Sequence, residues 1–130
     1  MFLLLQAIQI EKDNPILEKH LEIQAPQNIQ TLFKNACYDC HSNQTNWPWY
    51  SSIAPFSWVI KRHVEHGRNA LDFTAWESYD EQTKTKKLKA IYRTVYGSMP
   101  LPAYETFHDK AQLSKEQREL IQTWTGARPF

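Results

Sequence analysis

Apolar side chains recur at intervals of three and four residues along several stretches of the chain, a spacing typical of amphipathic α-helices. The first stretch begins at Gln27, directly after Pro26, and carries Ile29, Leu32, Phe33, Ala36 and Cys37 on one stripe. The second runs from Pro55 to His66, with Gly67 as its expected stop, and its apolar face is Phe56, Val59, Ile60 and His63. The third is expected to end at Gly97 and has Leu88, Ile91, Tyr92, Val95 and Tyr96 in register.

Two further segments carry the polar signature of a helix start. Ser114 and Gln117 have the spacing of a capping box, in which each side chain bonds to the backbone of the other residue. The helix after them is expected to stop at Gly126 and to bury Leu120, Ile121 and Trp124. Thr74 and Glu77 have the same spacing, which predicts a short helix directly after Thr74.

The fold class follows from these elements and from the composition. No stretch alternates apolar and polar residues as a half-buried strand would. The 130 residues include only three glycines, whereas all-β folds with many tight turns usually need more. The hydrophobic share of 42% is that of a packed globular chain of one domain. We therefore expect an all-α domain.

The first ten residues are apolar but interrupted by Gln6 and Gln9. They are fewer than the ~20 apolar residues that span a bilayer, and they lack the basic start and cleavage site of a signal peptide. We divide the chain into an N-terminal apolar segment and arm, residues 1–25, and a main domain, residues 26–130. Two interpretations of the apolar segment stay open: the remnant of a signal anchor, which would tether the protein to a membrane, and an amphipathic helix that packs on the domain.

Charge gives no sign of a particular partner. Fifteen lysines and arginines oppose fourteen acidic residues, which leaves a formal net charge of +1. This is not the basic footprint of a nucleic-acid-binding protein, so we expect no nucleic acid among its partners.

The residues Cys37, Cys40 and His41 form a Cys-x-x-Cys-His motif that uses both cysteines of the chain. Thiols at this spacing can form thioether bonds to the two vinyl groups of a haem, and the adjacent imidazole then becomes the proximal ligand of the iron. A redox-active dithiol would require a strand before the motif, where the pattern predicts a helix. A zinc site would pair the cysteines with His63 and His66, whose separation is too short for a zinc finger. The motif favours covalently bound haem.

A sixth ligand of the iron would come from a distant part of the chain. Met99 follows the helix that is expected to end at Gly97, and Pro100 and Pro102 stiffen its loop. A thioether in this position would raise the reduction potential relative to a second histidine. The alternative is that Met99 fills a gap in the core. The competing ligands are the other histidines, of which His63 is the strongest because it lies on an apolar helix face; the remainder are His20, His66 and His108.

Aromatic and basic residues near the motif could also contact a haem. Several large rings lie close to it in sequence and are expected to wall a haem cavity: Trp47, Trp49, Tyr50 and Trp58. Three basic side chains could pair with the haem propionates, or else be solvated helix charges: Lys61, Arg62 and Arg68.

Several segments together resemble a small bacterial haem-binding domain family of monohaem c-type cytochromes. The segments that carry the resemblance are Cys37-Tyr38-Asp39-Cys40-His41-Ser42-Asn43, Trp47-Pro48-Trp49-Tyr50-Ser51, Ile53-Ala54-Pro55, Gly67-Arg68, Phe73-Thr74-Ala75-Trp76, Met99-Pro100-Leu101, His108 and Leu113-Ser114. The resemblance implies a helical domain that is periplasmic, or anchored to a membrane and facing the periplasm.

The residues and the resemblance together predict an all-α, cytochrome c-like domain wrapped around one covalent haem. Its cofactor-binding residues would be Cys37, Cys40, His41 and Met99, of which His41 and Met99 bind the iron. We expect one-electron transfer between exported redox partner proteins, because six-coordinate iron has no open site for a substrate. One alternative is a peroxidase-like enzyme or a gas sensor with an open or labile sixth position. Another is a domain without haem, in which Cys37 and Cys40 form a disulfide or a metal clip.

Overall fold

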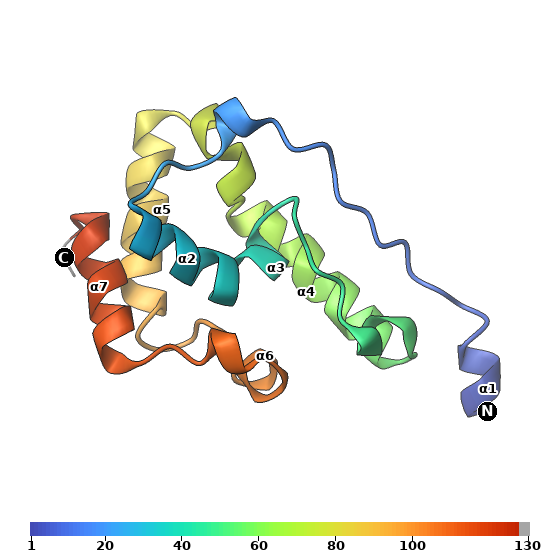
Figure 1. The fold of residues 1–130 in the computed structure, drawn as a ribbon. Helices are drawn as coiled ribbons and strands as arrows, with labels where there is room; N and C mark the ends of the chain where they lie inside the picture. Colours follow the sequence, from blue (N-terminus) through green and yellow to red (C-terminus); the bar gives the residue numbers. More distant parts are fainter. Residues whose placement is uncertain (128–130) are drawn as a thin grey trace.

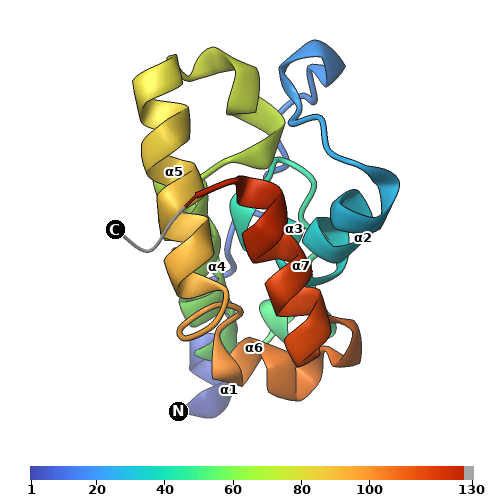
Figure 2. The same ribbon diagram turned by 90° about the vertical axis from the view of Figure 1, so that its left-hand side faces the viewer.

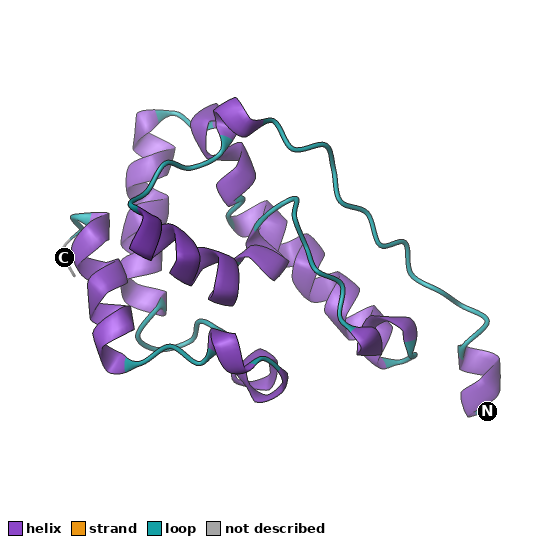
Figure 3. Ribbon diagram, viewed as in Figure 1, coloured by secondary structure: helices purple, strands orange, loops and turns teal. Residues whose placement is uncertain are grey.

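The computed structural model describes residues 1–127, which form helices and loops and contain no β-strand (Figure 3). The α-helices of this part of the chain are α1 (Phe2–Leu5), α2 (Gln27–Ala36), α3 (Tyr38–His41), α4 (Phe56–Ala70), α5 (Glu81–Thr94), α6 (Pro102–Phe107) and α7 (Lys115–Thr125). Short 3₁₀ helices lie between them: η1 (Lys19–Leu21), η2 (Trp49–Ser52), η3 (Phe73–Ser78) and η4 (Asp109–Ala111). The predicted all-α fold is confirmed. The last three residues of the expected main domain, 128–130, lie outside the described residues.

The helices gather into two packed groups (Figures 1 and 2). In one group, α5 and α7 lie side by side and α2 contacts α7. In the other, the short α3 packs on the long α4, which η2 also contacts. The main core lies where α2, η3 and α7 meet: the ring of Phe33 stacks on Phe73 at 4.5 Å between centroids, and Trp124 meets Phe33 edge-on at 5.3 Å.

The first part of the N-terminal arm runs along α4 (Figure 1), and the arm then enters the core at Ile23, which is buried and whose N–H donates to the Phe73 carbonyl at 2.8 Å. Residues 1–5 form only one helical turn with no buried side chain. The Gln6 amide is paired with the backbone of Ala54, because its Nε2 donates to the Ala54 carbonyl at 3.1 Å and its Oε1 accepts from the Ala54 N–H at 2.9 Å. Further along, the Arg68 side chain bonds to Asp13 and Asn14. No helix of residues 1–127 is long and apolar enough to cross a membrane.

The last helix matches its sequence signals closely. Ser114 and Gln117 form the predicted capping box, with both reciprocal hydrogen bonds present. The helix ends at Gly126, whose φ of 64° lies in the left-handed region that favours glycine. Ile121 is buried as expected. Leu120 is 40% exposed, so its predicted burial is wrong.

Three other local predictions are wrong. Gly67 does not end its helix, since α4 continues to Ala70. The turn after residue 72 is the 3₁₀ helix η3, and its N-cap is Asp72 rather than Thr74. Thr74 instead accepts a hydrogen bond from the Asn43 N–H, which ties η3 to the segment after the cysteine motif. The third helix stops before Gly97, since α5 ends at Thr94. The helix α6 was not among the predicted elements.

Candidate functional site

The cysteine motif occupies the junction between α2 and α3. Cys37 ends α2, and its N–H donates to the Phe33 carbonyl at 2.8 Å. The carbonyl of Cys37 then accepts from the N–H groups of Cys40, at 3.2 Å, and His41, at 2.9 Å. This single tight turn holds both thiols and the imidazole within five residues. Burial, reinforced by neighbouring Cys40, raises the pKa of the Cys37 thiol to about 12. Burial and the charge of Asp39 raise that of Cys40 to about 11, so both sulfurs are protonated thiols at neutral pH.

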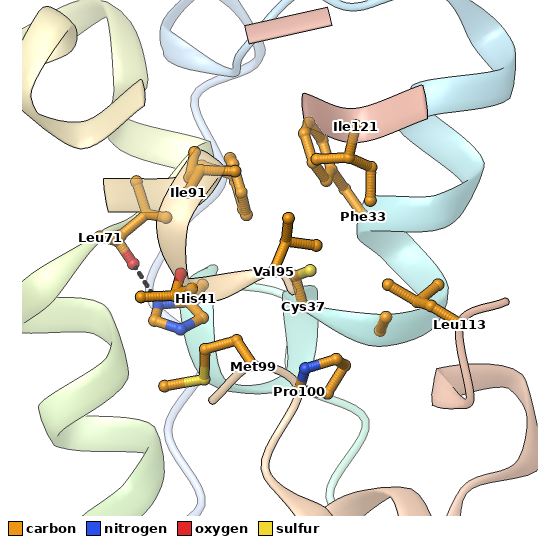
Figure 4. Close-up of a pocket in the computed structure, with 13 residues that line it drawn as sticks. Phe33, Cys37, His41, Leu71, Ile91, Val95, Met99, Pro100, Leu113 and Ile121 are labelled. Carbon is orange, nitrogen blue, oxygen red and sulfur yellow. Dashed lines mark hydrogen bonds between the residues drawn. The ribbon is translucent and has the colours of Figure 1, made fainter. Parts of the chain in front are cut away.

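The His41 imidazole is oriented by two backbone carbonyls of α4 and its end. Its Nδ1 lies 2.8 Å from the carbonyl oxygen of Gly67 and 2.9 Å from that of Leu71; the second contact is dashed in Figure 4. Carbonyls only accept, so Nδ1 carries the proton. Burial lowers the pKa of His41 despite the opposing effect of these two carbonyls, and the ring is therefore neutral. A neutral ring protonated at Nδ1 leaves the lone pair of Nε2 free to bind a metal ion.

Gly67 allows α4 to approach the motif this closely. A Cβ atom at this position would lie 2.2 Å from the carbonyl oxygen of Cys40, which is far inside van der Waals contact. The glycine therefore serves close packing of α3 on α4, and one turn of α4 then supplies both carbonyls to His41. Its sequence signal was interpreted as a helix stop because a close approach between distant segments leaves no mark in the local pattern.

The four predicted cofactor-binding residues line the same cavity. Cys37, Cys40, His41 and Met99 all border a space of about 260 Å³ between α3, α4 and the loop after α5. A smaller cavity of about 60 Å³, shown in Figure 4, shares Cys37, His41 and Met99 with it and extends into the apolar core. A third cavity, of about 220 Å³, meets the first at Cys40 and runs between α4 and α6. Most of the side chains around these three spaces are apolar: Phe33, Ala36, Leu71, Phe73, Ile91, Val95, Leu101 and Phe107 among them.

Comparison with known proteins agrees with this geometry. Residues 1–127 match the sequence model of one protein family, the haem-binding domain. The chain belongs to that family. No curated protein and no solved structure matches it.

The residues of this haem-binding domain fit the cofactor. The site offers two thiols, an imidazole with an available Nε2 and a thioether, around a largely apolar space. Metal clips receive no such support. Within residues 1–127, no group of three or more histidine, cysteine or acidic side chains is placed to hold a metal ion. In particular, Cys37 and Cys40 do not form a cluster with His63 and His66 that could bind zinc.

The other histidines of the haem-binding domain differ in their access to the cavity. His63 is half-buried and lines two of the three cavities, so it is the one that competes best with Met99. His66 is exposed at the rim of one cavity. His108 is held elsewhere: its Nε2 lies 2.8 Å from the Tyr50 hydroxyl and its ring stacks on Tyr104 at 4.0 Å. His20 is exposed in the N-terminal arm.

Only some of the predicted aromatic and basic contacts face the site. Trp49 and Tyr50 line the cavity beside Cys40, whereas the Trp58 indole bonds to the Ile8 carbonyl and Trp47 lines a separate polar hollow. No lysine or arginine lines the three cavities described above. Arg68 is engaged with the Ser42 carbonyl at 2.7 Å and with the N-terminal arm.

The sequence interpretation missed the contribution of α6. Tyr104 lines two of the cavities, and its hydroxyl donates to the carboxylate of Asp39, which lies between the two cysteines. Burial raises the pKa of the Tyr104 hydroxyl, and the hydrogen bond to Asp39 raises it further. The usable signal was Pro102, since proline is favoured in the first turn of a helix.

Proposed function

We propose that this haem-binding domain is a monohaem c-type cytochrome that carries single electrons between exported redox proteins. Cys37 and Cys40 would hold the haem through thioether bonds, with His41 as proximal ligand and Met99 as distal ligand. The observation that carries the proposal is that these four side chains border one cavity while the Nδ1 of His41 is already paired, which leaves Nε2 for the iron.

A bound haem would supply an iron that cycles between the ferric and ferrous states. The chain would supply the rest. The Gly67 and Leu71 carbonyls fix the tautomer and direction of His41. The largely apolar lining would favour the apolar macrocycle of the haem over water. Two protein ligands would leave no position for a substrate, which favours electron transfer over catalysis.

A periplasmic location, or a membrane-anchored position facing the periplasm, belongs to the same proposal. It rests on the resemblance to exported cytochromes and on the need for a compartment in which haem is attached to cysteine thiols. The partners would be other redox proteins of that compartment.

The test uses protein produced in a host that exports and matures c-type cytochromes. The haem should stay attached through acid-acetone extraction and denaturing electrophoresis, and a Cys37→Ala/Cys40→Ala variant should carry none. The ferric protein should show the weak red charge-transfer band of methionine-ligated haem. Met99→Ala should lose this band, lower the reduction potential and bind carbon monoxide when reduced.

His63→Ala is the matched control, because His63 lines the same cavity but is not the proposed ligand. It should keep the band. If His63→Ala became high-spin while Met99→Ala kept the wild-type spectrum, the distal ligand would be His63. A wild-type protein that is already high-spin would favour the enzyme or gas-sensor alternative. Haem that extracts intact would contradict covalent attachment altogether.

A further inference from the structure

Arg118 of α7 makes a set of hydrogen bonds around the loop that carries Met99. Its side chain is 18% exposed. The guanidinium donates to the carbonyls of Val95 and Met99, the latter at 2.9 Å, and to the Glu105 carboxylate at 2.9 Å. The Nε of Arg118 donates to the Leu113 carbonyl at 3.2 Å. One side chain therefore connects the end of α5, the Met99 loop, α6 and the segment before α7.

These bonds hold the Met99 backbone from both sides. The N–H of Met99 donates to the Thr94 carbonyl at 2.8 Å, and its carbonyl accepts from Arg118. The partners of Arg118 also bracket Met99 in sequence, with Val95 before the loop and Glu105 after it. With both backbone polar groups held, the direction of the Cα–Cβ bond of Met99 is fixed, and with it the point from which the thioether reaches into the cavity.

The guanidinium group suits this role better than an ammonium group would. It is planar and presents several N–H donors in a fixed fork, so it can bond to acceptors on several segments at once. Val95 also lies at the C-terminus of α5, where carbonyls lack helical partners and a cation is favoured. The ion pair with Glu105 balances the charge of this mostly buried group.

We propose that Arg118 is a positioning residue that holds Met99 against the haem iron and so keeps other small ligands from the sixth position. The proposal rests on the proposed function, since it requires Met99 to be the distal ligand. It assigns to Arg118 the task of making the site a closed electron carrier rather than an open ligand-binding site.

The test compares the holoprotein with Arg118→Gln and Arg118→Lys, each carrying covalent haem. Arg118→Gln should retain helical circular dichroism but lose most of the red charge-transfer band. Its ferrous form should bind carbon monoxide about tenfold faster or more, the scale of one lost charge-assisted hydrogen bond. Arg118→Lys should show the same direction of change, because the ammonium group keeps the charge but not the fork. The matched control is Arg93→Gln: Arg93 is exposed on α5 and forms no side-chain hydrogen bond or ion pair within residues 1–127.

The outcomes separate this inference from the function beneath it. If Met99→Ala changes the spectrum while a folded Arg118→Gln keeps the wild-type band and excludes carbon monoxide, Arg118 has only a structural role and the inference is overturned. If Met99→Ala leaves the spectrum unchanged, the proposed ligation fails first and this inference fails with it. Should Arg118→Gln not fold, Glu105→Gln decides: it removes the charge partner, and it should accelerate carbon monoxide binding in the same direction if Arg118 positions Met99.

Discussion

At the scale of single residues, the packing around His41 depends on the absence of one side chain. Gly67 brings the α4 backbone against the Cys40 carbonyl, and its own carbonyl is one of the two that accept from His41. The orientation of the imidazole and the packing of the cysteine motif therefore share one cause. The other two glycines do not allow a close approach between segments, since a Cβ at either Gly97 or Gly126 would meet no atom within 4 Å.

Gly67→Ala should lower the free energy of unfolding by about 3 kcal/mol, the upper end of the usual cost of overpacking, because the new Cβ meets backbone rather than a flexible side chain. Gly97→Ala is the control: it adds the same methyl group in open space at a residue without positive φ, and it should change stability little. Thermal or chemical unfolding of the two holoproteins measures the difference. Equal stability of the two variants would show that α4 can move away from Cys40 at no cost.

At the scale of elements, α6 connects the loop that carries Met99 to the cysteine motif. It begins directly after Leu101, and its Tyr104 hydroxyl donates to the Asp39 carboxylate. The same carboxylate accepts a hydrogen bond from the Asn46 N–H at 3.0 Å, so it also holds the segment that follows the cysteine motif. The two halves of the site are thus tied together by a hydrogen bond to a charged group.

Tyr104→Phe should cost about 1.5–3 kcal/mol of stability, the usual range for losing a hydrogen bond to a charged partner. The ring would remain stacked on His108, so packing changes little. Tyr96→Phe provides the comparison, because Tyr96 is 46% exposed and its hydroxyl has no hydrogen-bond partner within residues 1–127. Denaturant unfolding of both variants gives the difference. A Tyr104→Phe protein as stable as Tyr96→Phe would mean that the bond to Asp39 adds nothing net.

The elements also show where prediction from sequence succeeds. The capping box at Ser114 and the left-handed Gly126 involve residues a few positions apart, and both were predictable because their chemistry is local. The helix α2 was predictable from its apolar stripe. The roles of Gly67, Thr74 and Tyr104 were not, because they depend on contacts with Cys40, Asn43 and Asp39 in other parts of the chain. For the site, the motif indicated haem and its attachment residues, but the roles of Tyr104 and Arg118 arise only from tertiary contacts.

At the scale of the whole molecule, the cavities of the candidate site take the place of part of a hydrophobic core. The apolar face of α4 is partly open: Phe56 is 59% exposed and Val59 is 52% exposed, and both line the cavity that runs from Cys40 to α6. One cavity lies between α4 and α6, a second lies between α3 and α4, and the smallest reaches Phe33 in the packed core. The cofactor would supply the apolar surface that these helices lack.

Protein without haem should therefore be molten. Wild-type chain expressed without haem attachment is expected to keep much of its helical circular dichroism, to lose near-ultraviolet signals and to bind a hydrophobic dye. The physical reason is that empty apolar cavities are costly. The holoprotein from an exporting host is the control and should unfold cooperatively. A sharp, native-like thermal transition in the haem-free chain would contradict the expectation.

The two sides of the cavity differ in how far apart their residues lie along the chain. Both thiols and the imidazole come from one turn, whereas the Met99 backbone is held at the cavity by Arg118 of α7, a contact between distant parts of the chain. Maturation of the proposed cytochrome would thus proceed in an ordered sequence of steps. The haem could be attached covalently to a chain that is still largely unfolded. The sixth bond to iron would form last, when the rest of the domain has folded.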